Sequence, residues 1–173
     1  MSEKRKYKWQ PTWKDYLIYS VLFIFCIGLI ILCFLFFNNL KTIWLVLIGV
    51  TIILIAFFIF GGLSKSAFMK HAKTLNEKNW LDTKVVVDRG IYSVVRHPIY
   101  LSFMMYILGL IFISQHWLSL VFGIPIIVYM YQCMRDEEKN NIAKFGNNYK
   151  IYMKKVPRAN FLLGIIRLLR TRK

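Results

Sequence analysis

The chain has 173 residues, of which 57% are hydrophobic, and 24 Lys and Arg against 8 Asp and Glu give it a formal net charge of +16. The hydrophobic share exceeds that of ordinary soluble domains. Such an excess of positive charge is typical either of nucleic-acid binding or of contact with an anionic membrane surface. The uncharged segments of the chain decide in favour of the membrane.

Two segments, 16–40 and 42–64, contain no charged residue, and each is longer than the roughly 20 apolar residues that cross a bilayer core. A third uncharged segment, 97–134, has 38 residues and is too long for a single crossing. The polar sequence Ser114-Gln115-His116 divides it into two shorter spans. We therefore predict an all-α polytopic membrane protein with four transmembrane helices, the third and fourth forming a hairpin.

The basic residues lie almost entirely on one side of such a bundle. Five precede Asp15, seven lie in 65–96 and eleven in 135–173, whereas the two opposite turns share only Lys41. Because positive residues remain on the cytoplasmic side, we expect both termini and the central loop in the cytoplasm. This arrangement accounts for the net charge without nucleic acid. The wealth of Lys, Ile, Asn and Phe favours a bacterial cell membrane.

The length fits a single membrane-embedded domain, residues 1–173. Residues 1–63 read as an N-terminal anchor and a two-helix scaffold, in which glycines such as Gly49 permit close helix contacts. Residues 64–158 contain the polar groups suited to chemistry, and 159–173 form a basic tail of the kind that lies on a membrane surface.

Between the second and third spans we expect a short helix around Phe68–Leu75, an extended stretch at Lys84–Val87 and a turn at Asp88-Arg89-Gly90. Pro98 suits the first turn of the third helix, where its missing N–H has no cost. Pro125 lies inside the fourth span and should kink it.

The fourth helix should extend from Trp117 to Phe145, beyond the membrane into the cytoplasm, and stop at Gly146. A second cytoplasmic helix, NYKIYMKKV, follows it. One face of this helix carries Tyr149, Tyr152, Met153 and Val156.

Two polar clusters are candidates for chemistry. The first comprises Tyr92, Arg96, His97 and Tyr100, which would equally suit an interfacial helix start, with the arginine on a lipid phosphate and the tyrosines at the headgroups. The second is the acidic run 136–138, for which pairing with nearby lysines is the ordinary explanation. At about 100° per residue, however, the three acids cannot all face one direction, so we expect one of them to point into the bundle. The hairpin brings residues 97 and 137 to the same membrane face.

These groups suit S-adenosylmethionine, because a carboxylate accepts from a ribose or amino group, helix-start N–H groups hold an anion, and tyrosine faces stabilise a sulfonium cation. Other enzyme classes lack their motifs: the sequence contains no Gly-x-Gly-x-x-Gly, P-loop, His-Glu-x-x-His or Cys-x-x-Cys. We expect no metal site. No repeat symmetry or mid-membrane ionisable group indicates a transporter.

GIYSVVRHPIY, followed by a pair of spans and then EEKNNIAKFGNNYKIYMKKVP, resembles the isoprenylcysteine carboxyl methyltransferase family, which belongs with the membrane phospholipid methyltransferases. The resemblance covers roughly residues 80–158. It implies an S-adenosylmethionine site, with the cofactor entering from the cytoplasm and a lipophilic or lipidated substrate from the bilayer. By similarity, the cofactor-binding residues are Lys84, Val85, Val86, Val87, Tyr92, His97, Pro98, Ile99, Tyr100 and Glu137.

One position departs from the family pattern. Eukaryotic members carry a substrate-contacting arginine four residues before the glutamate, where this chain has Cys133. We expect Arg135 or Arg158 to take over that role. The catalytic candidates are therefore His97, Glu137 and Arg135, and the substrate-binding candidates are Arg158 and Cys133.

The expected function is methyl transfer from S-adenosylmethionine to a lipophilic acceptor, as in isoprenylcysteine carboxyl O-methylation. Phospholipid amine N-methylation is an alternative, and a non-enzymatic four-helix membrane protein is an alternative of another class. A carboxylate acceptor needs alignment and exclusion of water but no base, whereas an amine or hydroxyl acceptor needs one. The sequence leaves this choice and the oligomeric state open.

Overall fold

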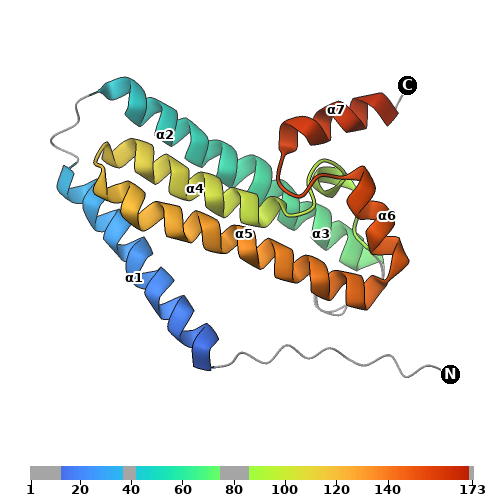
Figure 1. Ribbon diagram of the computed structural model, residues 1–173. Helices are drawn as coiled ribbons and strands as arrows, with labels where there is room; N and C mark the ends of the chain where they lie inside the picture. Colours follow the sequence, from blue (N-terminus) through green and yellow to red (C-terminus); the bar gives the residue numbers. More distant parts are fainter. Residues whose placement is uncertain (1–12, 37–41, 75–85, 172–173) are drawn as a thin grey trace.

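The computed structural model describes residues 13–36, 42–74 and 86–171, and within these ranges its regular secondary structure is all helical, with no strand. This confirms the all-α prediction. The long helices pack side by side as a bundle, and the shorter helices lie near one end of it (Figure 1). In chain order they are α1 (Trp13–Phe36), α2 (Ile43–Ile55), the π-helix η2 (Ala56–Gly62), α3 (Leu63–Thr74), the 3₁₀ helix η4 (Gly90–Ser93), α4 (Pro98–Ser114), α5 (Leu118–Phe145), α6 (Asn147–Lys155) and α7 (Phe161–Thr171).

Three helical stretches in the described ranges are long and apolar enough to cross a membrane: Tyr16–Leu35, Ile43–Ala67 and Leu118–Phe145. Their large apolar side chains are mostly exposed, which in a bundle of this kind fits contact with lipid rather than with water. The fourth apolar helix, α4, has 17 residues and lies at the lower limit for a span. Four crossings therefore remain a prediction.

Helices α2, η2 and α3 run on from one another, because Ala56 and Leu63 at the junctions keep right-handed helical dihedrals. A π-helical segment shifts the hydrogen-bonding pattern of the backbone and often marks a functional region. Here the side chain of Ser102 in α4 donates to the carbonyl oxygen of Ala56 at 2.8 Å. The π-helix is thus tied to the helix that begins at the polar cluster.

Helix α4 is the centre of the bundle and contacts α1, α2, η2 and α5. Its approach to α2 depends on two glycines. A Cβ on Gly49 would lie 2.7 Å from the carbonyl oxygen of Gly109, and one on Gly109 would lie 2.5 Å from Cγ1 of Ile53. The two backbones can approach this closely only because neither position has a side chain.

The predicted hairpin break is confirmed, since α4 ends at Ser114 and α5 begins at Leu118. Gln115 has a left-handed backbone conformation, with φ 49°. Its side-chain amide accepts from the N–H of Thr42 at 3.0 Å and donates to the Thr42 carbonyl at 2.8 Å. The hairpin turn is thereby fastened to the start of α2.

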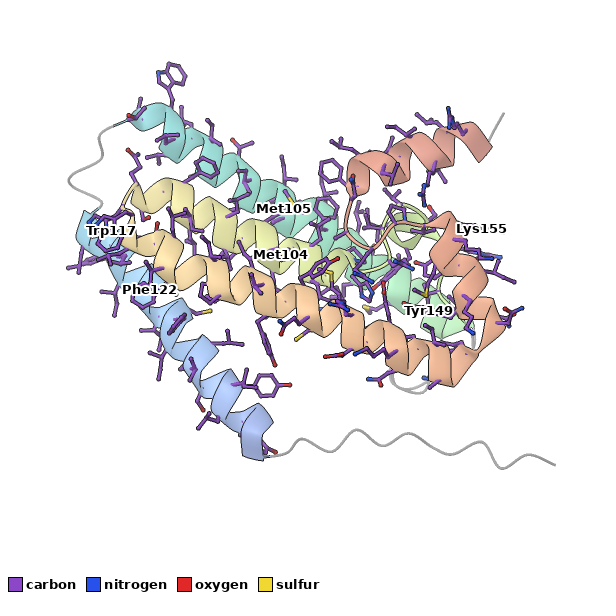
Figure 2. All side chains as sticks on the ribbon, viewed as in Figure 1. Met104, Met105, Trp117, Phe122, Tyr149 and Lys155 are labelled. Atoms are coloured by element: carbon purple, nitrogen blue, oxygen red, sulfur yellow. The ribbon has the colours of Figure 1, made fainter. Side chains whose placement is uncertain are left out.

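Helix α1 packs on α5 around Phe122, whose ring lies 5.3 Å from that of Phe25 and against Gly28; Phe122 is labelled in Figure 2. Leu29 joins a small buried core with Ile107 and Ile126. Pro125 lies inside α5 without ending it, and the kink expected there stays a prediction.

Helix α5 runs without interruption to Phe145 and stops at Gly146, which has φ 62°, as predicted. Helix α6 then buries Tyr149, Tyr152 and Val156, with Met153 packed beside them, which confirms the predicted face. The predicted helix near Phe68–Leu75 corresponds to α3, which begins earlier, at Leu63. Predictions for Lys84 and Val85 lie outside the described residues.

Candidate cofactor site

The site forms where α4 begins. Pro98 occupies the first turn of the helix and His97 precedes it, as expected for a proline without an N–H. Both residues are buried, and 4% of the surface of His97 is exposed. The imidazole is therefore held at the edge of the bundle, and its two nitrogens face the Glu137 and Glu138 carboxylates of α5.

A short backbone pairing connects this segment to the chain that follows α6. The N–H of Arg96 donates to the carbonyl of Pro157 at 3.0 Å, and the N–H of His97 donates to the carbonyl of Arg158 at 3.2 Å. These bonds satisfy buried polar groups of the backbone. They also bring Arg158 to the start of α4.

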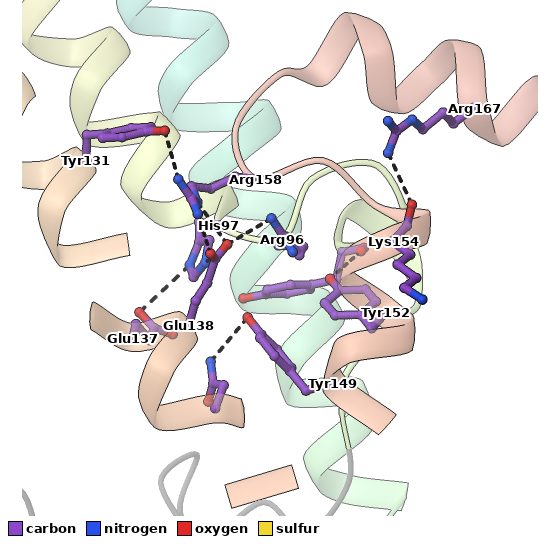
Figure 3. Close-up of polar contacts among 12 residues, drawn as sticks. Arg96, His97, Tyr131, Glu137, Glu138, Tyr149, Tyr152, Lys154, Arg158 and Arg167 are labelled. Carbon is purple, nitrogen blue, oxygen red and sulfur yellow. Dashed lines mark hydrogen bonds and ion pairs between the residues drawn. The ribbon is translucent and has the colours of Figure 1, made fainter. Parts of the chain in front are cut away.

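Glu138 on α5 lies at the centre of the polar contacts (Figure 3). Its side chain is 4% exposed and accepts from Arg96 Nη2 at 2.9 Å. Arg158 donates to both of its oxygens, from Nε at 3.0 Å and from Nη2 at 2.6 Å. His97 Nε2 lies 3.4 Å from the same carboxylate. Two guanidinium groups offset the cost of burying this charge.

Of the three acids, Glu138 is therefore the one that points into the bundle. The expectation that lysines pair with it is wrong, because its partners are arginines from the start of α4 and from the α6–α7 connection. Asp136 does pair with Lys139, at 2.7 Å on the exposed face of α5. Two positions along α5, about half a helical turn, thus separate a surface pair from a buried cluster.

Glu137 occupies a more open position, with 43% of its side chain exposed and Oε2 at 3.9 Å from His97 Nδ1. The ring of Tyr100 on α4 lies 5.8 Å from that of His97, and its phenol is in the electrostatic field of Glu137. Burial and the Glu137 carboxylate together raise the pKa of Tyr92 to about 12. The Tyr92 phenol consequently remains a hydrogen-bond donor at neutral pH.

Tyr92 is positioned by η4. Gly90 begins this turn with φ 63°, a left-handed conformation that favours glycine. The carbonyl of Tyr92 accepts from the hydroxyl of Tyr152 at 2.6 Å, and burial raises the pKa of the Tyr152 phenol. Helix α6 thereby holds the η4 turn in place.

The structure brings together four of the residues expected from the sequence: Tyr92, His97, Tyr100 and Glu137. The other residues expected to bind the cofactor differ in burial and in packing. Val86 packs against the α6 core, Val87 is half-buried, Pro98 is buried and Ile99 is 44% exposed.

The residues proposed to take part in substrate binding have different surroundings. Arg158 contacts Glu138, and its Nη1 donates to the Tyr131 hydroxyl at 2.8 Å. Cys133 is half-buried beside Tyr129, whereas Arg135 is exposed on α5.

Sequence reasoning did not find the buried contact between Arg96 and Glu138. It named Arg96 in the first polar cluster, where an interfacial helix start suited this residue equally well, and the choice among the three acids needed the rotation of α5. The angular spacing of consecutive helical residues was the available signal, because it required one acid to face inward.

Comparison with known proteins places this site within a family. The phospholipid methyltransferase family matches residues 43–148, which include α2 to α5 and the residues that converge at His97. The chain belongs to the phospholipid methyltransferase family. The sequence resemblance to this wider group is thereby confirmed.

Two curated relatives carry a more specific name. The chain is 35% identical over 74 residues to a protein-S-isoprenylcysteine O-methyltransferase of Schizosaccharomyces pombe, covering 42% of this chain and 31% of the relative. It is 30% identical over 126 residues to the protein of the same name from Dictyostelium discoideum, covering 70% of this chain and 51% of the relative. The chain thus aligns with about half or less of each relative's length. No solved structure matches it.

The arrangement combines an accessible carboxylate, two tyrosines and a buried histidine at one end, with a buried arginine–glutamate cluster at the other. Among the described residues no group of His, Cys, Asp and Glu could hold a metal ion. Binding of an organic ligand with both positive and negative groups is the chemistry that these side chains suit.

Proposed function

We propose that the chain is a membrane-embedded, S-adenosylmethionine-dependent methyltransferase acting on a lipophilic acceptor. The observation that carries this proposal is that the family match spans the segment in which Tyr92, His97, Tyr100 and Glu137 converge. The two relatives named as isoprenylcysteine O-methyltransferases support the same reaction class.

The residues present fit the methyl donor. Glu137, 43% exposed, offers a carboxylate to the donor's hydroxyl or amino groups. The rings of Tyr92 and Tyr100, both close to that carboxylate, suit a sulfonium cation. Val86 and Val87, both half-buried, supply apolar surface on the segment that leads to Tyr92. When bound, S-adenosylmethionine supplies an electrophilic methyl carbon.

The protein's part in the reaction is alignment and exclusion of water. Buried His97 and Pro98 fix the start of α4, and His97 Nδ1 faces the carboxylate of Glu137 at 3.9 Å. A carboxylate acceptor needs no base. For an amine or hydroxyl acceptor, Glu137 or His97 would take up the proton, since the Glu137 carboxylate is accessible and the buried His97 Nδ1 faces it at 3.9 Å.

For the acceptor, Arg158 is the better replacement of the arginine that Cys133 displaces. It touches Glu138 and Tyr131, whereas Arg135 lies on the exposed face of α5. Isoprenylcysteine carboxyl O-methylation is the first candidate, because both relatives carry that name. Phospholipid amine N-methylation is the second, because the family description names phospholipids.

We further propose a multi-pass protein of a bacterial cell membrane with four spans, cytoplasmic termini and a site at the cytoplasmic face. Helix α7, whose Leu162, Ile166 and Leu169 are at least 55% exposed, would lie on the membrane surface with its arginines near the headgroups. The donor then arrives from the cytoplasm and the acceptor from the bilayer.

The test is calorimetric binding of S-adenosylmethionine to purified full-length protein, compared between the wild type, Glu137→Gln and Asp136→Asn. We expect saturable binding by the wild type and by Asp136→Asn, which alters a neighbouring surface acid paired with Lys139. Glu137→Gln should weaken binding by about 10-fold or more, as expected for loss of a hydrogen bond to a charged group.

Absence of binding by folded wild-type protein would remove the methyltransferase proposal and favour a non-enzymatic membrane protein. Once binding is established, transfer of a labelled methyl group to a farnesylcysteine analogue or to phosphatidylethanolamine distinguishes the two acceptor classes.

A further inference from the structure

Arg96 is a buried cation that uses only part of its hydrogen-bonding capacity. Its side chain is 7% exposed, and Nη2 pairs with Glu138 at 2.9 Å. Its Nε and Nη1 atoms are buried and have no hydrogen-bond partner in the described part of the chain. Buried donors without acceptors are rare in proteins and call for an explanation.

The net charge of the cluster formed by Arg96, Arg158 and Glu138 indicates which kind of group would satisfy the unused donors of Arg96. Glu138 is shared between two guanidinium groups, because Arg158 donates to both of its oxygens at 3.0 and 2.6 Å. The side chain of Arg158 is 26% exposed and therefore reaches solvent, whereas that of Arg96 does not. Since an uncompensated buried charge is costly, the position beside Arg96 favours one further negative charge.

The imidazole of His97 lies between this cationic end and the acidic end of the site. Its Nε2 faces Glu138, the partner of Arg96, at 3.4 Å, and its Nδ1 faces Glu137 at 3.9 Å. Figure 3 shows Arg96 and Glu137 on opposite sides of His97. The site is therefore polarised, with carboxylate and tyrosines at one end and a guanidinium at the other.

S-adenosylmethionine has the complementary polarity, with a cationic sulfonium and an anionic α-carboxylate. We propose that Arg96 binds the carboxylate of the methyl donor through the donors that Glu138 leaves unused. The inference rests on the proposed function and adds to it the residue that recognises the amino-acid part of the cofactor. Because only Nη2 is engaged by Glu138, each edge of the guanidinium keeps an unused donor for a carboxylate oxygen.

The experiment compares three ligands by calorimetry on full-length protein: S-adenosylhomocysteine, its decarboxylated analogue, and 5′-methylthioadenosine, which lacks the amino-acid group. For the wild type we expect S-adenosylhomocysteine to bind about 10- to 100-fold more tightly than the decarboxylated analogue, the range of a charged hydrogen bond. In Arg96→Gln this ratio should fall to near 1, while the Kd of 5′-methylthioadenosine stays unchanged.

Arg158→Gln is the matched control, because it too removes one guanidinium from Glu138 and leaves the other in place. It should keep the wild-type ratio. If Arg96→Gln does not fold, Arg96→Lys replaces it, with an intermediate ratio expected because the charge remains but the planar fork is lost.

A wild-type ratio near 1 would overturn the inference, as would an unchanged ratio in a folded Arg96 variant, which would make Arg96 a structural partner of Glu138 only. An unchanged ratio together with a raised KM for an anionic acceptor would place the anion on the acceptor and overturn it equally. Failure of the wild type to bind any of the three ligands is a different result, because it removes the proposed function itself.

Discussion

Neighbouring acids on α5 have opposite environments, and the contrast is large enough to measure. The carboxylate of Glu138 is 4% exposed between two arginines, whereas that of Asp136 is 68% exposed beside Lys139. The first is a buried ion-pair cluster whose members depend on one another. The second is a surface pair of the kind that contributes little to stability.

We expect Glu138→Gln to lower the free energy of unfolding by about 3–5 kcal/mol, because it leaves two guanidinium groups without their counter-ion. Asp136→Asn should change it by less than about 1 kcal/mol. Unfolding by sodium dodecyl sulfate in mixed micelles measures both. Equal midpoints for the two variants would contradict the central role of Glu138.

At this scale the sequence predicted four members of the site but not the buried pair. His97 and Glu137 were found because their motifs have a recognisable spacing. The contact of Arg96 with Glu138 was not found, because an arginine at a helix start suits a lipid headgroup equally well. The carbonyls of Pro157 and Arg158 that hold residues 96 and 97 come from a distant segment, and no local pattern reveals such a contact.

At the scale of helices, the close approach of α2 and α4 fixes the position of α4, and the site lies at the start of this helix. The sequence indicated Gly49 as a contact position, and the structure adds Gly109 as its counterpart. These two glycines are 60 positions apart, so no Gly-x-x-x-Gly motif records them. Helix ends were predicted well where glycine, proline or polar turns mark them, as at Gly146 and Pro98.

Gly49→Ala should lower the free energy of unfolding by about 1–3 kcal/mol, the usual cost of overpacking, because its Cβ would meet the Gly109 carbonyl oxygen at 2.7 Å. Gly62→Ala is the control, since its Cβ would lie at an ordinary 3.6 Å from the nearest atom, the Phe57 carbonyl oxygen. The same micelle titration applies. A variant Gly49→Ala as stable as Gly62→Ala would mean that the two helices can separate without cost.

For the whole molecule, charge and hydropathy predicted the helical class and the hairpin, because both depend on composition averaged over many residues. The number of crossings is harder to predict, since α4 has only 17 residues. The hairpin turn follows the end of α4 at Ser114, whereas the candidate site surrounds the start of α4 at Pro98, the end near α6 and α7 (Figure 1). The predicted topology places these two ends on opposite sides of the membrane.

Single cysteines introduced by Trp117→Cys and Asn147→Cys, with the three native cysteines replaced, test this topology. Both positions are exposed. A membrane-impermeant maleimide should label position 117 in intact cells and position 147 only after lysis, because basic segments remain in the cytoplasm. Labelling of both positions from the same side would exclude the four-span arrangement.

The backbone hydrogen bonds from residues 96 and 97 to residues 157 and 158 mean that the site can be completed only late in synthesis of the chain. The bundle can enter the membrane while synthesis continues, but Glu138 gains its second guanidinium only when Arg158 has left the ribosome. The 61 residues that follow His97, up to and including Arg158, take about 3–12 s to synthesise at roughly 5–20 residues per second. A nascent chain therefore enters the membrane before its site is complete. A chain that ends within α6 would lack Arg158 and would never complete the site.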